Sequence, residues 1–312
     1  LDSDNVEFPI NEKEVTSLIK KFYKSGSPIE LIGSGSKRKM GKSLQCSKTI
    51  SLSKLNGILE YLPEELYIKV KACTPIKLIE EELKKNYQQL AFEPTDFGLT
   101  FHGKENFGTI GGVMSCNFAG PRRFKVGSVR DHILGFKGVN GKGETIKSGG
   151  TVVKNVTGYD LSKILSGSFG TLTVLTEIAV KVLPKPHTNK TIVIDNPHLK
   201  NALNYLNVAL SSSSDPSGAV FYPDYFREHF SLNDLTAEGA LTAIRIEGPV
   251  DSVDQRIDYL RTELKLGTEN ISILDPEQSS LFWEKTQNLS VFSNTNNNLI
   301  RVIVPPSSTF EL

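Results

Sequence analysis

The segment Gly33-Ser34-Gly35-Ser36-Lys37 has the residue types of an anion-binding loop. Glycine adopts positive φ angles at little steric cost and lets a ligand approach the backbone closely. Backbone N–H groups turned to one side can bind phosphate oxygens, serine hydroxyls add donors, and Lys37 or Arg38 could offset phosphate charge. Taken alone, the segment favours a solvated basic turn, so its chemistry must be judged with the rest of the chain.

Two common phosphate-binding patterns fit this loop poorly. A Walker A loop ending at Gly41-Lys42-Ser43 needs a glycine where Ser36 stands, and it should lead into a helix, whereas the chain continues into a predicted strand at 49–52. A Rossmann fingerprint starting at Gly33 needs its last glycine where Arg38 stands, and again no helix follows. Both nucleotide-binding interpretations are therefore weak.

Further glycine-rich motifs follow the loop. They are GTIGGVMSCN (108–117), AGPRR (119–123), GSVRDHILG (127–135), KNVTGYD (154–160) and SGSFGTLTVLTE (166–177). In this combination and order the chain resembles the FAD-binding fold of the vanillyl-alcohol oxidase and p-cresol methylhydroxylase (PCMH) superfamily. Within it, the series looks most like the FAD-binding E-type subunits of bacterial glycolate oxidases. Weaker matches continue into the second half as RIEGP (245–249), FWEKTQNLSVF (282–292) and LIRVIVPPS (299–307).

The resemblance implies an α+β protein with two domains. Residues 1–186 would form a PCMH-type FAD-binding domain of two α/β subdomains, and 187–312 a ferredoxin-like α+β cap domain over the substrate. The chain begins with Leu and ends on Phe310-Glu311-Leu312 without a closing element. We therefore expect a fragment of a longer protein, with the cap domain truncated at its C-terminus.

The resemblance also implies FAD and a set of residues that hold it. Residues 33–37 would bind the pyrophosphate, 109–112 would pass close to the diphosphate and flavin, and backbone atoms of Ile178 would meet the adenine. The full set is Gly33, Ser34, Gly35, Ser36, Lys37, Pro94, Thr109, Ile110, Gly111, Gly112, Ser115, Asn117, Gly127, Ser128 and Ile178. The histidine that attaches flavin covalently in some relatives is missing from the first loop, so we expect non-covalent FAD.

Several other motif residues have structural explanations. We expect Gly135, Gly158, Gly167 and Gly170 to serve turns or packing, Asp160 to cap a short helix at 161–165, Arg130-Asp131 to form an internal ion pair or backbone brace, and Tyr159 to lie in the core. Arg122 and Arg123 differ, because paired guanidinium groups can bind a carboxylate bidentately. They could hold a substrate carboxylate, dock an acidic partner subunit, or be solvated.

Catalytic residues cannot be assigned. Oxidation of a 2-hydroxy acid needs a base for the hydroxyl proton and an anchor for the carboxylate, and no such set is recognisable. No metal site is predicted, because the five histidines lack HExxH or HxH spacing and Cys46, Cys73 and Cys116 contain no CxxC pair. Three cysteines so spaced cannot ligate an iron–sulfur cluster and fit a reducing compartment.

The function implied by the resemblance is that of a FAD-binding subunit that oxidises a 2-hydroxy acid, glycolate to glyoxylate. Its partners would be a flavin-containing D-type subunit and an iron–sulfur subunit that takes the electrons. Two alternatives stay open: a stand-alone FAD-dependent D-2-hydroxy-acid dehydrogenase, and a non-catalytic structural subunit of the complex. The expected location is the cytoplasm, with the inner membrane reached only through partners.

Composition excludes some other classes. The 312 residues carry 36 Lys plus Arg and 35 Asp plus Glu, for a net charge of +1, so no global basic field for nucleic acid exists. No apolar run long enough to span a membrane is present, and the first ten residues are acidic rather than signal-like.

Local patterns predict the elements that carry the motifs. In the first domain we expect a helix at 12–24, between Asn11 and Gly26, and a second helix opened by Thr74-Pro75. We expect strands at 29–32, 49–52 and 66–72, and a hairpin of 133–139 and 145–147 around Asn140–Gly143. A long strand at 172–183 should end at Pro184-Lys185-Pro186, which is the expected domain boundary. The second domain reads as βαββαβ, typical of a ferredoxin-like sheet covered by two helices.

Overall fold

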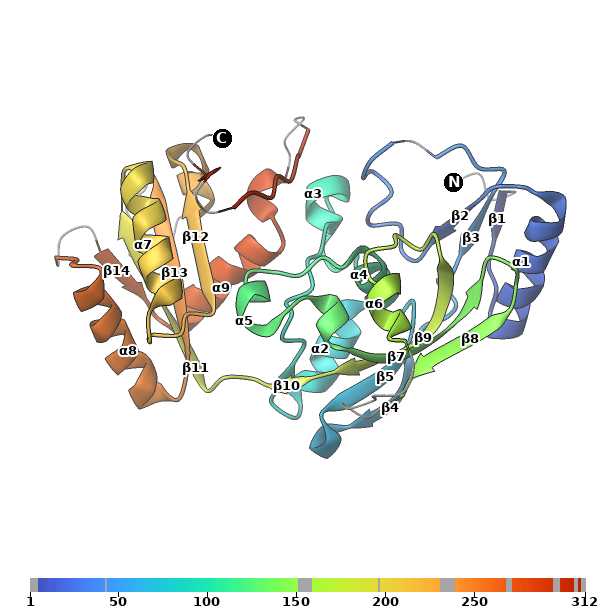
Figure 1. Cartoon of the computed structure of the whole chain (residues 1–312), viewed down its shortest axis with the longest axis horizontal. Coiled ribbons are helices and arrows are strands. Elements are labelled where there is room, and N and C mark those ends of the chain that lie inside the picture. The colour runs from blue at the N-terminus through green and yellow to red at the C-terminus, as the bar shows by residue number, and fades with distance from the viewer. Residues whose placement is uncertain are drawn as a thin grey trace. The chain divides into compact units, whose positions relative to one another are not determined.

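The computed structural model describes residues 5–42, 44–150, 159–195, 197–230, 239–267, 271–293, 298–305 and 308–309. The chain divides into two compact units, residues 1–185 and 186–312, whose elements are labelled in Figure 1. The boundary falls inside the Pro184-Lys185-Pro186 segment. Within the described ranges, no helix has the length and apolar character needed to cross a membrane.

A small parallel sheet and one helix open the first unit. Its elements are β1 (Val6–Glu7), α1 (Glu12–Ser25), β2 (Ile29–Ile32) and β3 (Lys48–Ser51), with strand order β1-β3-β2. As predicted, the Asn11 side chain caps α1 by accepting the Glu14 N–H, and Gly26 ends the helix with φ 63°. The buried face of α1, which carries Val15 and Ile19, packs in one cluster with Ile50 of β3.

A five-stranded antiparallel sheet forms the larger part of the first unit. Its order is β4 (Ile58–Leu62), β5 (Tyr67–Lys71), β9 (Thr173–Lys181), β7 (Ile133–Asn140) and β8 (Thr145–Gly149). The β7–β8 hairpin turns at Asn140, as its Asn-Gly-Lys-Gly sequence predicts. Two short strands, β6 (Gln88–Gln89) and β10 (Leu183–Pro184), pair separately.

Short helices complete this unit. They are α2 (Ile76–Lys84), α3 (Gly98–His102), α4 (Ile110–Cys116), α5 (Arg123–Val126) and α6 (Leu161–Leu165), with single 3₁₀ turns at Pro63–Glu65 and Val129–Asp131. The core lies between α2, α4 and the five-stranded sheet, where Ile79, Ile110 and Met114 pack against Ile68 and Ile178, all fully buried. Burial of these side chains supplies most of the driving force for holding α4 against the sheet.

The second unit has the predicted βαββαβ order. Its elements are β11 (Thr188–Asp195), α7 (Leu199–Ser211), β12 (Gly218–Tyr222), β13 (Leu241–Gly248), α8 (Val250–Glu263), β14 (Ile271–Leu274) and α9 (Pro276–Gln287), with 3₁₀ turns at Asp224–Phe230 and Ser290–Phe292. The strands form one antiparallel sheet in the order β12-β13-β11-β14. This is the ferredoxin-like topology, and the α+β fold class is confirmed.

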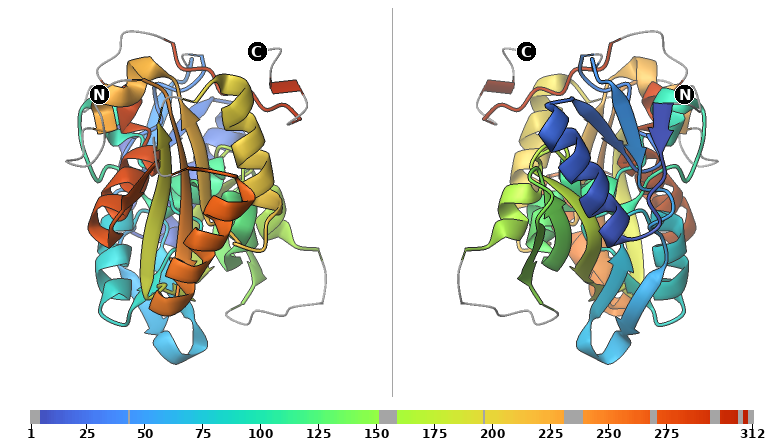
Figure 2. Two further views of the ribbon diagram at one scale, coloured as in Figure 1. Left: turned by 90° about the vertical axis from the view of Figure 1, so that its left-hand side faces the viewer. Right: turned by 90° about the vertical axis from the view of Figure 1, so that its right-hand side faces the viewer.

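Alternation along the strands gives this sheet two apolar faces. Ile192 of β11 and Ile244 of β13 contact α7 and α8 on one face, whereas Val193 and Ala243 belong to the cluster under α9 on the other. The left-hand view of Figure 2 shows α7 and α8 together on one side of the sheet and α9 on the opposite side. The third helix explains why the strands read as continuous apolar runs, since both faces are covered.

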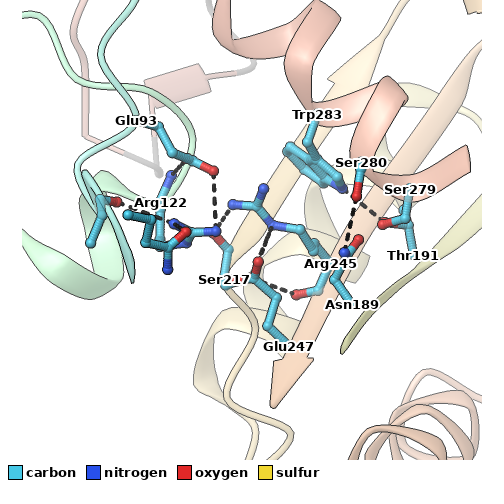
Figure 3. A network of polar contacts seen from close by, with 12 residues as sticks. Glu93, Arg122, Asn189, Thr191, Ser217, Arg245, Glu247, Ser279, Ser280 and Trp283 are labelled. Atoms are coloured by element: carbon cyan, nitrogen blue, oxygen red, sulfur yellow. Dashed lines mark hydrogen bonds and ion pairs between the residues drawn. The ribbon is translucent and has the colours of Figure 1, made fainter. Parts of the chain in front are cut away.

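A buried polar chain joins α9 to the sheet (Figure 3). The indole Nε1 of Trp283 donates to Thr191 Oγ1 at 2.8 Å, and that oxygen lies 2.7 Å from Ser279 Oγ. The Arg245 guanidinium stacks over the Trp283 ring at 4.7 Å and its Nε donates to Ser217 Oγ at 3.0 Å. Each polar atom in this chain has a partner, which is what burial demands.

The structure corrects some local predictions. Thr74 does not cap α2; its hydroxyl bonds Gly57 and Lys71, and Pro75 occupies the cap position without a side-chain bond. Tyr159 is 90% exposed, so its core placement was wrong. Asp160 stands at the start of α6 but makes no capping bond. Gly158 lies outside the described residues.

We expect Thr191→Val to destabilise the second unit by about 1–3 kcal/mol, because it leaves the Trp283 N–H buried without an acceptor. Trp283 is the only tryptophan in the sequence, so its fluorescence during denaturant unfolding reports on this unit.

Thr242→Val on β13 is the matched control. The Thr242 hydroxyl is buried and has no hydrogen-bond partner within the described residues, so its removal should be neutral or stabilising. Equal losses in the two variants would mean that the Trp283 bond contributes nothing beyond side-chain packing.

Candidate cofactor site

Three glycine-rich segments meet around one cavity in the first unit. The cavity has a volume of about 310 Å³. Its lining includes residues 33–38 of the loop after β2 and residues Thr109, Gly111, Gly112, Ser115 and Cys116 around α4. At the start of β9 it includes Phe169, Gly170, Thr171, Thr173, Val174 and Leu175. Motifs that are far apart in the sequence therefore share one wall, as a single large ligand would require.

The loop itself is tightly turned. Gly35 has φ 85°, and its carbonyl accepts the Arg38 N–H at 3.1 Å. The Ser34 hydroxyl donates to the carbonyl of Phe107, which ties the loop to the segment before α4. The Ser36 carbonyl lies 3.2 Å from His102 Nε2. Glycine is needed at 35 because a side chain there would be strained in the left-handed region.

Lys37 and Arg38 have different surroundings. The Lys37 amine lies 3.4 Å from Ser36 Oγ and 5.8 Å from the Phe97 ring centroid. Burial lowers the pKa of Lys37, while its interactions with Cys116 and Asp96 act in the opposite direction. Arg38 instead makes two hydrogen bonds to the carboxylate of Glu30, at 2.7 and 2.9 Å.

The cavity glycines serve different purposes. A Cβ on Gly111 would stand 2.7 Å from the Ala72 carbonyl oxygen, which already accepts the Gly111 N–H at 2.7 Å. Gly111 is therefore needed for packing α4 on the end of β5. A Cβ on Gly33 would meet Thr109 Oγ1 at 2.8 Å, whereas one on Gly112 would lie 3.6 Å from the Lys37 amine, at the cavity wall.

Two thiols also line the cavity. Burial raises the pKa of Cys73 to about 11, against a hydrogen bond with Thr109 that lowers it. Burial also raises the pKa of Cys116, against the nearby Lys37 charge. Both groups are neutral thiols at physiological pH, so neither is a ready nucleophile. Sequence motifs gave no sign that Cys73 or Glu30 would reach this cavity.

Four of the predicted cofactor residues lie outside the cavity lining and have local roles. Asn117 ends α4 with φ 53°, and its Oδ1 accepts the Arg130 N–H at 3.1 Å. A Cβ on Gly127 would meet Asp131 at 2.8 Å, and the Ser128 hydroxyl donates to the Asp131 carboxylate at 2.9 Å. The Asp131 carboxylate therefore braces the local backbone, which was one of the two roles expected for Arg130-Asp131. Pro94 forms an isolated β-bridge with Ala119.

Ile110 and Ile178 are core residues in this structure. Both are fully buried among apolar neighbours, and neither lines the cavity around the loop. Ile178 lies in β9 between Val70 and Phe136 and borders a smaller cavity of about 150 Å³. Contact with the cofactor stays a prediction for these two residues and the four described above, and equally for the predicted residues that do line the cavity.

Arg122 and Arg123 do not act as a pair. The Arg122 N–H donates to Glu93 Oε2 at 2.6 Å and its guanidinium lies 3.4 Å from Glu93 Oε1 (Figure 3). Nη1 of Arg122 also donates to Gln89 Oε1 at 3.2 Å. Arg123, at the start of α5, is exposed. Arg123 is thus exposed for a substrate carboxylate or an acidic partner, whereas Arg122 is held by Glu93.

Comparisons with known proteins agree with this geometry. Residues 4–149 match the family described as FAD binding domain. Alkyldihydroxyacetonephosphate synthase matches with a TM-score of 0.71 at 21% identity, covering 92% of this chain and 54% of that one. p-Cresol methylhydroxylase with substrate bound matches with a TM-score of 0.68 at 15% identity, covering 92% and 62%. Residues 4–149 thus match a FAD-binding domain, and the fold is that of the PCMH-type structures.

Curated relatives are FAD-linked oxidoreductases and hydroxy-acid dehydrogenases. Glycolate oxidase subunit GlcE of Escherichia coli is 40% identical over 166 residues, covering 53% of this chain and 45% of the relative. Glycolate oxidase subunit GlcD of Bacillus subtilis is 27% identical over 269 residues, covering 85% and 56%. D-lactate dehydrogenase of Anaerostipes hadrus is 34% identical over 154 residues, covering 49% and 30%. The chain thus spans about half or less of these relatives.

The cavity fits FAD by its own chemistry. Gly33, Gly35 and Gly112 leave backbone free of side chains along its wall, and Lys37 and Ser36 bring an amine and a hydroxyl to the same place. Such a cradle suits the two phosphates of a dinucleotide, which need N–H donors, hydroxyls and one cation at short range.

We expect Gly35→Asp to reduce FAD retention at least tenfold, because it adds a carboxylate to the loop that lines the cavity. The flavin-to-protein ratio after gel filtration measures this. Gly41→Asp is the control, since Gly41 has φ 73°, has open space around its Cα and is absent from the lining. Equal flavin content in the two variants would contradict the assignment of the loop.

We expect Gly111→Ala to lower the free energy of unfolding by about 1–3 kcal/mol, because the new methyl group strikes the Ala72 carbonyl. Gly141→Ala, in open space on the β7–β8 turn, should have little effect. Denaturant unfolding of the FAD-free proteins separates this packing role from a cofactor contact. Unchanged stability of Gly111→Ala would rule out the packing explanation.

Proposed function

We propose that this chain is the FAD-binding subunit of a glycolate-oxidase-type complex that oxidises a 2-hydroxy acid, glycolate to glyoxylate, and passes the electrons to an iron–sulfur partner subunit. The observation that carries the proposal is that residues of the loop after β2, of the α4 region and of the start of β9 line one cavity. The 40% identity to a glycolate oxidase subunit supports this choice within the FAD-linked oxidoreductases.

The chain's own contribution is to hold and shield the cofactor. When bound, FAD supplies two-electron oxidation of the substrate C–H and O–H bonds. Lys37 would balance phosphate charge, the glycine backbone would give close approach, and the apolar side chains of Leu31, Leu52 and Val174 would exclude water from the cavity wall. Catalytic acid or base residues are left unassigned.

The cysteines of the chain support the proposed transfer of electrons to a partner. Its three cysteines have no CxxC spacing, and Cys73 and Cys116 are neutral thiols in the cofactor cavity rather than cluster ligands. Arg123 is the exposed cation that would meet an acidic partner or the substrate carboxylate, because Arg122 is engaged by Glu93. We propose a cytoplasmic complex that reaches the membrane only through its partners.

A stand-alone D-2-hydroxy-acid dehydrogenase is the second candidate. It is favoured by the relatives named D-lactate dehydrogenase and D-2-hydroxyglutarate dehydrogenase, the latter 26% identical over 180 residues in Xanthomonas citri. In this case the natural full-length chain would need no partner for turnover with an electron-accepting dye. A non-catalytic assembly subunit is the third candidate.

The three candidates separate in one experiment on the natural full-length protein, purified alone and with its co-purifying subunits. We expect bound flavin in both preparations and dye reduction by glycolate only in the complex, because electrons leave through a partner. Turnover of D-lactate or D-2-hydroxyglutarate by the isolated chain would favour the stand-alone enzyme. A colourless chain that takes up no added FAD, in a fully active complex, would leave only the assembly role.

A further inference from the structure

The two cations at the end of the glycine loop both line the cavity, but their charged groups have different partners. Lys37 places its amine beside Ser36 and near Gly112, both of which line the wall. The Arg38 guanidinium instead binds the carboxylate of Glu30, on the strand that precedes the loop. Adjacent basic residues in a phosphate-binding loop would be expected to share the ligand, so this division needs an explanation.

The carboxylate of Glu30 is buried and fully used. Its side chain is 5% exposed, and Oε1 accepts from Arg38 Nε at 2.7 Å. Oε2 accepts from Arg38 Nη2 at 2.9 Å and from Thr49 Oγ1 at 2.9 Å. The two parallel bonds fix the guanidinium in one orientation, as bidentate arginine–carboxylate pairs do. Thr49 stands opposite Glu30 in the β2–β3 pairing, which aligns its hydroxyl.

This ion pair closes the loop at its base. Glu30 lies in β2 before the loop and Arg38 at the end of the turn, so the pair joins the two ends of the Gly33–Lys37 segment. The Arg38 side-chain stem also passes 3.4 Å from the position of a Cβ on Gly35, and the Arg38 N–H bonds the Gly35 carbonyl. The backbone curve that aims the loop's N–H groups therefore depends on where Arg38 is held.

The pair also removes a charge that would oppose an anionic ligand. Glu30 itself belongs to the cavity lining. Without Arg38 it would be a buried, uncompensated negative charge beside the phosphates, and repulsion between like charges is strong where water is excluded.

We propose that Arg38 is a positioning residue for FAD binding: it neutralises Glu30 and holds the glycine loop in shape, while Lys37 alone of the two carries charge to the diphosphate. This rests on the proposed use of residues 33–37 for that diphosphate. Arg38 touches Glu30 and the loop rather than the cofactor.

The test measures the affinity for FAD of the full-length protein after its FAD has been removed. Four variants are compared with wild type: Arg38→Gln, Glu30→Gln, the double variant and Thr49→Val. We expect Arg38→Gln to bind FAD about 10- to 100-fold more weakly, because it leaves Glu30 charged and unpaired. Glu30→Gln should weaken binding less, and the double variant should bind more tightly than Arg38→Gln alone. Thr49→Val, which changes no charge, should weaken binding a few-fold through the loop.

The opposite pattern overturns the proposal. If Arg38 bound the phosphates directly, freeing it by Glu30→Gln would tighten binding, and the double variant would be as weak as Arg38→Gln. Salt supplies an independent readout: Lys37→Met should reduce the salt dependence of FAD affinity, whereas the double variant should keep it, because its net charge is unchanged. If the salt dependence of FAD affinity fell in the double variant as it does in Lys37→Met, this would count against the proposal that Lys37, and not Arg38, carries charge to the diphosphate.

Two controls keep the outcome clear. Circular dichroism and thermal unfolding identify any variant that fails to fold, and Arg38→Lys, which keeps the charge but loses the bidentate geometry, should fall between wild type and Arg38→Gln. FAD affinity is measured without substrate. A chain that gives the expected affinities but turns over no 2-hydroxy acid within its complex would refute the proposed function and leave this inference standing.

Discussion

The site depends on close approach of backbone to backbone at the ends of strands that are remote in sequence. The Gly111 N–H bonds the Ala72 carbonyl, whose oxygen would lie 2.7 Å from a Cβ on Gly111, and a Cβ on Gly33 would lie 2.8 Å from Thr109 Oγ1. These contacts bring the loop after β2 against α4, and the Ser115 carbonyl then accepts N–H groups from the segment before β9. A cavity walled by backbone follows from this packing, and with it the capacity to bind a dinucleotide rather than a small substrate alone.

Elements with a complete local signal could be predicted from the sequence. Helix α1 has an N-cap, an apolar stripe and a C-terminal glycine within one stretch, and the β7–β8 hairpin has an Asn-Gly turn between two strands. Helix α9 was missed although Asp275, Pro276 and Gln278 form a capping box with proline at the first position. Its apolar residues pack against the sheet face that a ferredoxin-like domain with two helices leaves open. The need for a third helix on that face cannot be recognised from the spacing of apolar residues.

The site was predictable in outline only. Motif order correctly indicated FAD, whereas the use of the loop for its diphosphate stays a prediction. Motif order could not distinguish Gly111, whose missing side chain serves packing, from Gly112, which borders the cavity. The Glu30–Arg38 pair was also out of reach, because it depends on the register that sets Glu30 beside Thr49 of a neighbouring strand. Sequence gives the neighbours along a chain, whereas the charge environment of a loop is decided by neighbours across the sheet.

In the proposed arrangement, the first unit would hold its cofactor largely through loop backbone and the Lys37 ammonium, and would commit few side chains to the substrate. This arrangement is compatible with the relatives, which are named for glycolate, D-lactate and D-2-hydroxyglutarate. Under this proposal, substrate choice would come from groups outside the cavity, since a glycine wall cannot discriminate between hydroxy acids. The neutral thiols of Cys73 and Cys116 agree with this division, because the cavity they line offers the cofactor an apolar, unreactive surface and leaves the chemistry of recognition elsewhere.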